Sequence, residues 1–134
     1  MITHVGTSIV FVRDQDKAKD FYVNTLGFTL KRDVPMYPGA TNRWLTVLPT
    51  PDAQTEILLD VAQGDFREAY QAEMIGKSQT LLLTATDVVD VIRDLKAKGV
   101  TIVSEPQVQD FGTMATIADQ DGNQILIVEL PTAP

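Results

Sequence analysis

The two halves of this chain repeat the same order of sequence features. Residues 7–28 contain an apolar strand pattern, an aspartate, an amphipathic helix pattern and a glycine, and residues 80–100 repeat them about 73 positions later. Two downstream stretches recur as well: RWLTVL (43–48) as TMATIA (113–118), and EILL (56–59) as QILI (124–127). A chain built from two copies of one unit usually forms a pseudo-symmetric cleft, so residues at matching positions become the candidates for a site.

Each copy predicts the order strand, helix and three strands. In the first copy, β-branched residues favour a strand over 5–12, Asp14 is a candidate helix N-cap, and Gly27 can end the helix in the left-handed conformation. Further strands are expected at 28–34, 43–48 and 55–61. The second copy is expected as strand 79–86, helix 87–98 and strands 100–104, 112–118 and 123–130. Because one copy cannot cover its own sheet, the two copies must pack together.

Residues 63–78 have no counterpart in the other half. They are acidic, and Phe66, Tyr70 and Met74 recur at a spacing of four, which predicts a short helix or an ordered linker between the copies. We expect a single domain over 1–134, with module one at 1–62, the linker at 63–78 and module two at 79–134.

Composition and charge exclude several classes of function. A chain of 134 residues with 44% hydrophobic residues can bury one core. A net charge of −7 disfavours nucleic acid and anionic membranes, and no apolar run is long enough to span a bilayer. This charge serves solubility, or it attracts a cationic ligand. The chain has no cysteine and its N-terminus lacks a secretion signal, so we expect a cytoplasmic protein.

Common catalytic patterns are missing from the sequence. Without cysteine and with one histidine, no Cys-His or Ser-His-Asp triad is visible, and no glycine-rich phosphate loop occurs. Asp119 and Asp121 lie in the stretch DQDGN, where hairpin-turn chemistry explains them better than paired carboxylates or calcium.

Three strings resemble signatures of the vicinal oxygen chelate superfamily, which includes glyoxalase I, bleomycin-resistance proteins and extradiol dioxygenases. They are VRDQDKAKDFYVNTLGF (12–28), TDVVDVIRDLKAKGV (86–100) and DQDGNQILIVEL (119–130), where Gln120 replaces the usual proline. The resemblance implies an α+β fold in which two tandem βαβββ modules form an open, eight-stranded, barrel-like cleft. It also implies a homodimer and, in the enzymes, one divalent metal held by His, Gln and Glu on the first and fourth strands of each module.

The residues at those ligand positions do not suit a metal. The first-strand position lies seven residues before the aspartate that starts each helix, which gives Thr7 and Thr80. The fourth-strand positions are Leu58 and Leu126. A catalytic divalent ion needs at least three good donors, whereas this set offers two neutral hydroxyls and two side chains without a donor. We therefore expect no metal and no cofactor.

His4 and Glu56 are the nearest alternatives to these ligands. His4 is three residues before Thr7, and on a strand an odd offset points to the opposite face, so a surface or strand-edge position is expected. Glu56 is two residues before Leu58 and could share its face, but a metal site made of Glu56, Thr7 and Thr80 would be poor.

Aromatic residues and methionine supply further candidates for the cleft. Trp44 aligns with Met114, and either a ligand platform or core or dimer-interface packing would explain Trp44. Tyr37, in the PMYPGA loop, and Phe111, in a DFG turn, could close over a bound molecule or simply anchor their loops. The predicted ligand-cleft residues are Thr7, Tyr37, Trp44, Glu56, Leu58, Thr80, Phe111, Met114 and Leu126.

Three functions fit these features. We favour a metal-independent protein of the bleomycin-resistance type that binds and sequesters a small toxic or cationic compound. The alternative is a glyoxalase- or dioxygenase-like enzyme with a non-standard or metal-free active site, in which Glu56, Arg43 or Tyr37 would be acid–base groups. A non-catalytic partner or regulatory domain is the third possibility, because a fold alone does not fix a function.

Overall fold

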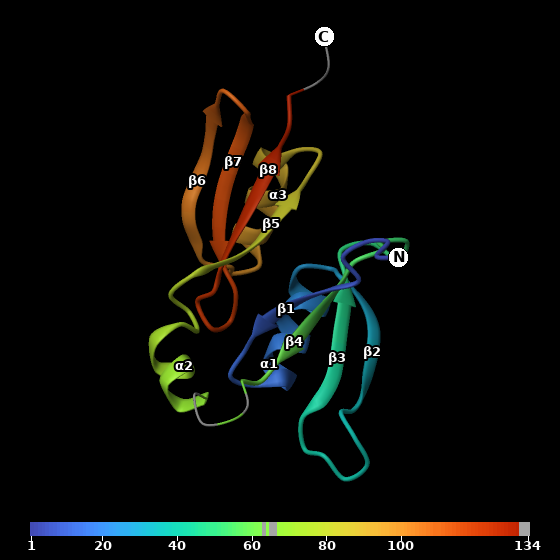
Figure 1. Cartoon of the computed structure of the whole chain (residues 1–134). Coiled ribbons are helices and arrows are strands. Elements are labelled where there is room, and N and C mark those ends of the chain that lie inside the picture. Colours follow the sequence, from blue (N-terminus) through green and yellow to red (C-terminus); the bar gives the residue numbers. More distant parts are fainter. Residues whose placement is uncertain (63, 65–66, 132–134) are drawn as a thin grey trace. The chain divides into compact units, whose positions relative to one another are not determined.

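The computed structural model describes residues 1–62, 64 and 67–131 (Figure 1). Within these residues the strands form two four-stranded sheets, which confirms the predicted α+β class with two βαβββ modules. The chain divides into two compact units, one of Met1–Ile75 and one that begins at Gly76. We call them unit 1 and unit 2 and describe each by itself. No helix among the described residues is long and apolar enough to cross a membrane.

Unit 1 contains the first predicted module and part of the linker. Its elements are β1 (Thr7–Phe11), α1 (Gln15–Lys19), η1 (Asp20–Thr25), β2 (Thr29–Pro35), β3 (Arg43–Leu48), β4 (Glu56–Asp60) and α2 (Arg67–Glu73). The strand order is β1-β4-β3-β2, with β1 parallel to β4 and the other neighbours antiparallel. All four predicted strands are present, with ends that differ by a few residues.

The helix of unit 1 begins and ends as its sequence predicts. The Asp14 carboxylate accepts a hydrogen bond from the Lys17 N–H at 3.1 Å, and Gly27 has φ 81° just after the helix. From Asp20 onward the helix widens into the π-helical turn η1, which the apolar pattern did not predict. The second module repeats the cap, because Asp87 accepts from the Asp90 N–H at 3.0 Å.

Unit 2 repeats the topology of unit 1. Its elements are β5 (Gln79–Thr84), α3 (Val88–Ala97), β6 (Ile102–Gln109), β7 (Gly112–Ala118) and β8 (Gln124–Glu129), in the sheet order β5-β8-β7-β6. The predicted strand 100–104 was wrong at its end, because β6 continues through Pro106 to Gln109. A proline is tolerated there because β6 is an edge strand and its register shifts between Ser104 and Gln107.

The turn between β7 and β8 is the predicted hairpin. The Asp119 carboxylate accepts hydrogen bonds from the N–H groups of Asp121 and Asn123, both at 2.9 Å, and Gly122 has φ 89°. These contacts assign Asp119 to turn formation.

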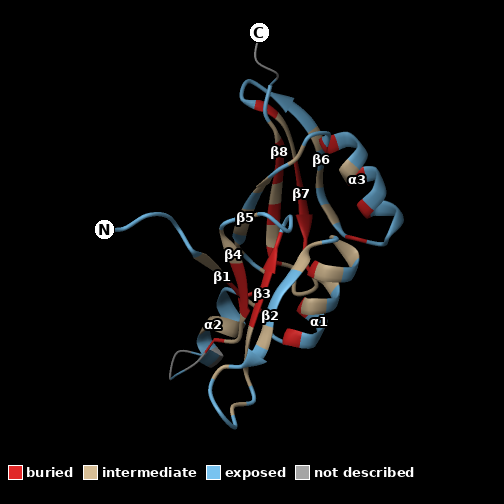
Figure 2. Cartoon of the chain, turned by 90° about the vertical axis from the view of Figure 1, so that its right-hand side faces the viewer, coloured by how far each residue is buried: buried red, intermediate tan, exposed pale blue. Residues whose placement is uncertain are grey.

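Each unit has a core between its helix and one face of its sheet (Figure 2). In unit 1 this core contains Val10, Val12, Ala18, Tyr22, Leu45, Val47 and Leu59, each at most 1% exposed. In unit 2 it contains Val88, Ile92, Leu95, Ile117, Ile125 and Ile127. On the opposite face of each sheet, Leu58 of unit 1 and Val128 of unit 2 are also buried, whereas Ile9 and Leu82 are 54% and 62% exposed.

Helix α2 confirms the predicted short helix for part of the linker, whereas Phe66 lies outside the described residues. The ring of Tyr70 makes an edge contact with the ring of Phe11 at 4.9 Å between centroids. The Arg13 guanidinium donates to the backbone carbonyls of Gln71 at 3.2 Å and Ile75 at 2.9 Å. These contacts attach α2 to the end of β1.

Candidate functional site

The sheet face opposite α1 carries most of the site residues predicted for unit 1. Side chains alternate along a strand, and the register places Leu58 beside both Ile9 and Thr46. We call this the distal face of unit 1; it is formed by Thr7, Ile9 and Phe11 of β1, Glu56, Leu58 and Asp60 of β4, and Trp44, Thr46 and Leu48 of β3. Four predicted residues, Thr7, Trp44, Glu56 and Leu58, therefore share one face. Tyr37 does not lie on it.

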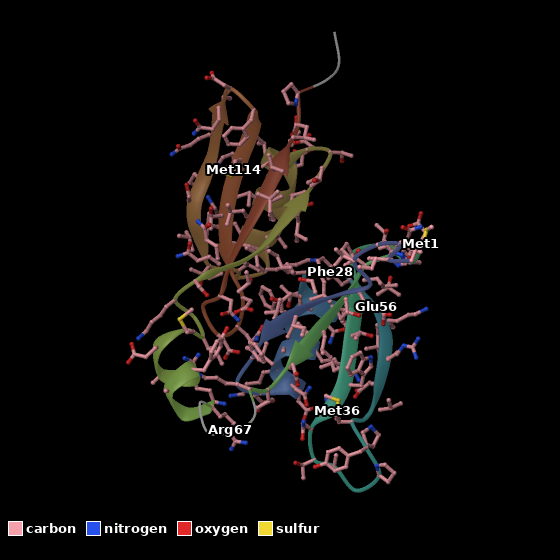
Figure 3. The ribbon with its side chains drawn as sticks, viewed as in Figure 1. Met1, Phe28, Met36, Glu56, Arg67 and Met114 are labelled. Carbon is pink, nitrogen blue, oxygen red and sulfur yellow. The ribbon has the colours of Figure 1, made fainter. Side chains whose placement is uncertain are left out.

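The polar contacts of this face centre on Glu56, which extends from β4 (Figure 3). Its carboxylate accepts a hydrogen bond from the Thr46 hydroxyl at 2.8 Å and lies 3.6 Å from Nε of Arg32. Thr7 lies directly opposite Glu56 in the register, whereas Leu58 lies opposite Ile9. Leu58 is 3% exposed and Ile9 is 54% exposed, so Ile9 offers more accessible apolar surface on this face than Leu58 does.

The sheet face opposite α3 in unit 2 is less polar. Leu126 lies beside Leu82 and Thr116. Met114, which Figure 3 labels, lies opposite Val128 in the register. The Thr80 hydroxyl donates to the backbone carbonyl of Gln124 at 3.3 Å. Phe111 lies in the turn between β6 and β7 and is 50% exposed. Leu126 and Met114 thus share one face, and Phe111 is separate from it.

The donor set of each unit does not fit the divalent ion that the resemblance implies for the enzymes. Leu58 and Leu126 have no lone pair to offer, and the hydroxyls of Thr7 and Thr80 are neutral. Across the described residues, no group of three or more His, Asp or Glu side chains is arranged to hold a metal. Glu56, the acidic residue opposite Thr7, is engaged by Thr46 and Arg32.

Asp60 also lies on the distal face and was not among the predicted cleft residues. It follows Leu58 by two positions, lies opposite Phe11 and is half-buried. Its carboxylate accepts a hydrogen bond from the Val61 N–H at 2.8 Å. Burial raises the pKa of Asp60 above the ordinary aspartate value, and the Val61 hydrogen bond opposes that rise. The alternation of Glu56, Leu58 and Asp60 in the string EILLD was the signal that could have identified it.

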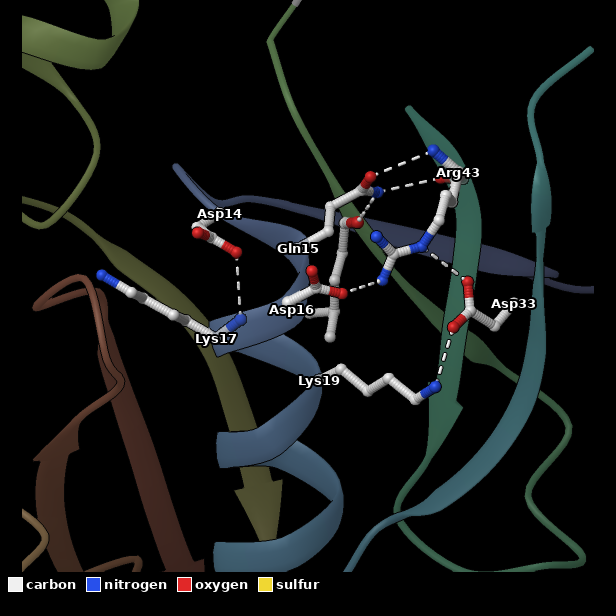
Figure 4. Close-up of polar contacts among 8 residues, drawn as sticks. Asp14, Gln15, Asp16, Lys17, Lys19, Asp33 and Arg43 are labelled. Carbon is white, nitrogen blue, oxygen red and sulfur yellow. Dashed lines mark hydrogen bonds and ion pairs between the residues drawn. The ribbon is translucent and has the colours of Figure 1, made fainter. Parts of the chain in front are cut away.

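A polar network on the other side of the sheet fixes α1 over β3 (Figure 4). The Asp33 carboxylate accepts from Arg43 Nε and from Lys19 Nζ, both at 2.8 Å, and a second Arg43 nitrogen lies 2.8 Å from Asp16. Burial would raise the pKa of Asp33, but the hydrogen bonds from Lys19 and Arg43 hold it below its usual value. Burial would likewise lower the pKa of Arg43, but Asp33 and Asp16 raise it. Arg43 keeps its proton and is an unsuitable general base.

Gln15 belongs to the same network and was also missed. Its side-chain nitrogen donates to the carbonyls of Arg43 at 2.9 Å and Leu59 at 2.8 Å, and its oxygen accepts from the Arg43 N–H at 3.0 Å. The side chain is 6% exposed. Nothing in the sequence distinguishes Gln15 from an ordinary residue in the first turn of a helix.

Tyr37 and His4 lie away from the distal face. Tyr37 lines an open, polar hollow of about 390 Å³ at the start of α1, and its role in closing over a ligand stays a prediction. The other residues lining this hollow are Asp14, Gln15, Asp16, Thr41, Asn42, Arg43, Val61 and Arg67. His4 is exposed before β1 begins, and its Nδ1 lies 3.0 Å from the Thr3 hydroxyl. It is a surface residue, as predicted, although it precedes the strand rather than lying on its other face.

Comparison with known proteins identifies relatives over nearly the full chain. Residues 1–127 match the family described as the Glyoxalase/Bleomycin resistance protein/Dioxygenase superfamily. The protein YurT of Bacillus subtilis (strain 168) is 41% identical over 130 residues, which cover 93% of this chain and 97% of YurT. The crystal structure of UcmS2 is 28% identical with a TM-score of 0.85, and it covers 96% of this chain and 98% of its own. That of TnmS3, an antibiotic binding protein from Streptomyces sp. CB03234, is 36% identical with a TM-score of 0.80 and covers 97% and 98%.

Proposed function

Since the chain belongs to the glyoxalase/bleomycin resistance protein/dioxygenase superfamily, we propose that it binds a small organic molecule without the help of a metal ion. The ligand would lie against the distal face of unit 1, and the chain would sequester it rather than transform it. The observation that carries this proposal is the residue set of that face, where Thr7 and Leu58 occupy the expected ligand positions and Ile9, Phe11 and Trp44 add apolar and aromatic surface.

The distal face has the composition of a binding surface for an organic molecule. Leu58 stands at the fourth-strand ligand position, and Ile9 beside it is largely exposed. Phe11 and Trp44 supply aromatic surface at one end of the same face. Such surfaces bind by removing apolar area from water, with a few polar groups that fix the orientation of the ligand. On β4, Asp60 is the acidic group available for that purpose, because Thr46 and Arg32 already engage the carboxylate of Glu56.

The similarity to TnmS3 supports a binding role. That protein is an antibiotic binding protein and is 36% identical to this chain over nearly all of both lengths. We infer that this chain binds a compound of the same general kind, an organic molecule large enough to cover several side chains of the sheet.

The apolar area that a ligand buries on the distal face sets the order of magnitude of its dissociation constant. A planar ring system that buries about 200 Å² of its apolar surface gains about 5 kcal/mol. With the translational and rotational cost of association offset by the apolar surface that the protein buries at the same contact, this gain corresponds to a dissociation constant of about 0.2 mM. One hydrogen bond to a charged side chain adds about 1.5 kcal/mol or more, which brings the constant into the micromolar range.

The chain carries its own probe for a binding experiment. Trp44 is the only tryptophan in the sequence, so its fluorescence reports directly on the distal face. We would strip the protein of metal, verify the removal by elemental analysis, and screen aromatic metabolites and cationic antibiotics by Trp44 fluorescence and thermal shift. We expect at least one of these two classes of compound to quench or shift Trp44 emission and to raise the melting temperature of the protein in the presence of EDTA.

A catalytic role makes a different prediction in the same experiment. If Zn, Ni, Mn or Fe bound stoichiometrically and stabilised the fold, the enzyme alternative would replace the binding role. If no class of compound stabilised the protein or changed Trp44 emission, a scaffold or regulatory role would replace it.

We further propose that the protein acts in the cytoplasm as a homodimer. In the sheet order of each unit, β1 and β5 are edge strands, and an edge strand leaves backbone groups available for another chain. Light scattering after gel filtration tests this assembly, which a purely monomeric mass would contradict.

A further inference from the structure

One end of the distal face of unit 1 is built differently from its counterpart in unit 2. In unit 2, β7 and β8 are paired at six positions, from Thr113 with Glu129 to Ala118 with Gln124. In unit 1, the pairing of β3 with β4 is confined to Thr46 with Leu58 and Val47 with Ile57. Toward the start of β3, the side chain of Gln15 forms hydrogen bonds with backbone groups of Arg43 and Leu59 (Figure 4). These bonds replace direct backbone pairing between β3 and β4 at this end of the sheet.

Asp60 lies at this end of the sheet, where aromatic side chains are its neighbours. Phe11 is opposite Asp60 across the β1–β4 pair, and the ring of Tyr70 from α2 contacts the ring of Phe11 at 4.9 Å. Trp44 lies on the same face of β3 as Thr46. It is two residues before Thr46 in the sequence and, because β3 runs antiparallel to β4, it lies toward the Asp60 end of the sheet. The equivalent positions in unit 2 are Thr84 and Val128, which face each other across β5 and β8. The carboxylate and the rings are therefore specific to unit 1.

The carboxylate of Asp60 has few protein partners within the described residues. Among the described residues it forms no ion pair, and its recorded hydrogen bond comes from the Val61 N–H. Arg13, two residues after the end of β1, directs its guanidinium to the carbonyls of Gln71 and Ile75. A half-buried carboxylate without a cation is unfavourable in isolation, which suits a group that receives its partner from a ligand.

We propose that Asp60 is the anchor for a positively charged nitrogen on a planar ligand, with Phe11, Tyr70 and Trp44 supplying aromatic surface beside it. This inference rests on the proposed binding function and specifies the chemical class of the ligand. A protonated amine satisfies the carboxylate by a charge-assisted hydrogen bond and also interacts favourably with the faces of aromatic rings. Glu56 does not provide an equivalent anchor, because Thr46 and Arg32 already engage its carboxylate.

Three acridines separate charge from shape. At neutral pH, 9-aminoacridine is a cation, acridine is uncharged and acridine-9-carboxylate is an anion, while all three share one ring system. We would titrate each into the metal-free full-length protein and follow both ligand fluorescence and Trp44 emission. The expected order of affinity is cation, neutral ring and anion, with at least about a tenfold gap between the first two.

A matched pair of variants assigns the preference to a residue. Asp60→Asn keeps the side-chain volume and should lower the affinity for 9-aminoacridine at least about tenfold while changing that for acridine less than about threefold. Glu56→Gln removes one negative charge from the same face of the same strand and should keep the cation preference. Because both variants change the net charge by one unit, their difference cancels the general attraction of an acidic protein for cations. Circular dichroism and melting temperature establish that both variants fold.

The outcomes separate the anchor from the binding function. If the acridines bind without a preference for the cation, or if Glu56→Gln loses that preference as fully as Asp60→Asn, the binding function stands and Asp60 is not the anchor. If none of the three acridines binds to the folded wild type, both the anchor and the distal face as a binding surface are refuted.

Discussion

Replacement of Gln15 by methionine tests how the sheet of unit 1 is held together. Methionine has nearly the same length and volume as glutamine but cannot make the three hydrogen bonds to Arg43 and Leu59. Each such bond contributes about 1 kcal/mol, and a buried backbone group left without a partner costs about as much or more. We therefore expect Gln15→Met to lower the free energy of unfolding by about 3 kcal/mol.

Urea denaturation measures the loss of global stability, and amide hydrogen exchange measures the loss of protection at individual N–H groups. The loss of about 3 kcal/mol corresponds to a fall of about 10 °C in melting temperature for a domain of this size. The Arg43 N–H, which donates to Gln15 at 3.0 Å, should lose its protection from exchange in the variant. As a control, Gln54→Met in an exposed loop should change stability by less than about 0.5 kcal/mol.

Two results would refute the reasoning about Gln15. A loss of less than about 1 kcal/mol, with an unchanged denaturant dependence, would show that the three hydrogen bonds are replaceable by water. Continued protection of the Arg43 N–H in the variant would show that β3 and β4 pair directly once the glutamine is gone.

Three further predictions follow from other parts of the chain. Gly112→Ala should cost more than about 3 kcal/mol, because the new Cβ would lie 2.2 Å from the Glu129 carbonyl oxygen at φ 137°, whereas Gly6→Ala has open space and should change thermal stability little. Asp33→Asn should cost about 1 kcal/mol at pH 7. The pKa of Asp33 is lower in the folded state than the unfolded value of about 3.9, so its contribution to the free energy of unfolding is present above that pH and is lost as the pH falls through the folded pKa. The difference in unfolding free energy between wild type and Asp33→Asn, measured in urea, should therefore shrink by pH 3. Added Zn, Ni, Mn or Fe should leave the melting temperature of the metal-free protein unchanged within about 1 °C, since Thr7, Leu58, Thr80 and Leu126 offer no adequate donor set.

Much of the fold could be predicted because its signals are local. Asp14 and Gly27 mark the ends of one helix, and their repetition at Asp87 and Gly99 gave the order of both modules. The missed features depend on contacts between distant segments. The π-helical turn η1 and the extension of β6 beyond residue 104 arise from packing and edge position, which leave no distinct local pattern.

The candidate site was predictable only in part for the same reason. The alternation of side chains along a strand placed Glu56 and Leu58 on one face of the sheet. The same alternation, followed two residues further along the strand, would have added Asp60. The contact of Phe11 with Tyr70 joins positions 59 residues apart and has no sequence signal of its own. The contacts of Gln15 with Arg43 and Leu59 likewise become visible only in three dimensions.

Isothermal titration calorimetry of the metal-stripped wild type with 9-aminoacridine tests the central claim most directly. Metal-independent binding predicts one site per chain with a micromolar dissociation constant, the same in EDTA and in the presence of added Zn or Mn. Binding heat that appears only after a divalent metal is restored would contradict the account.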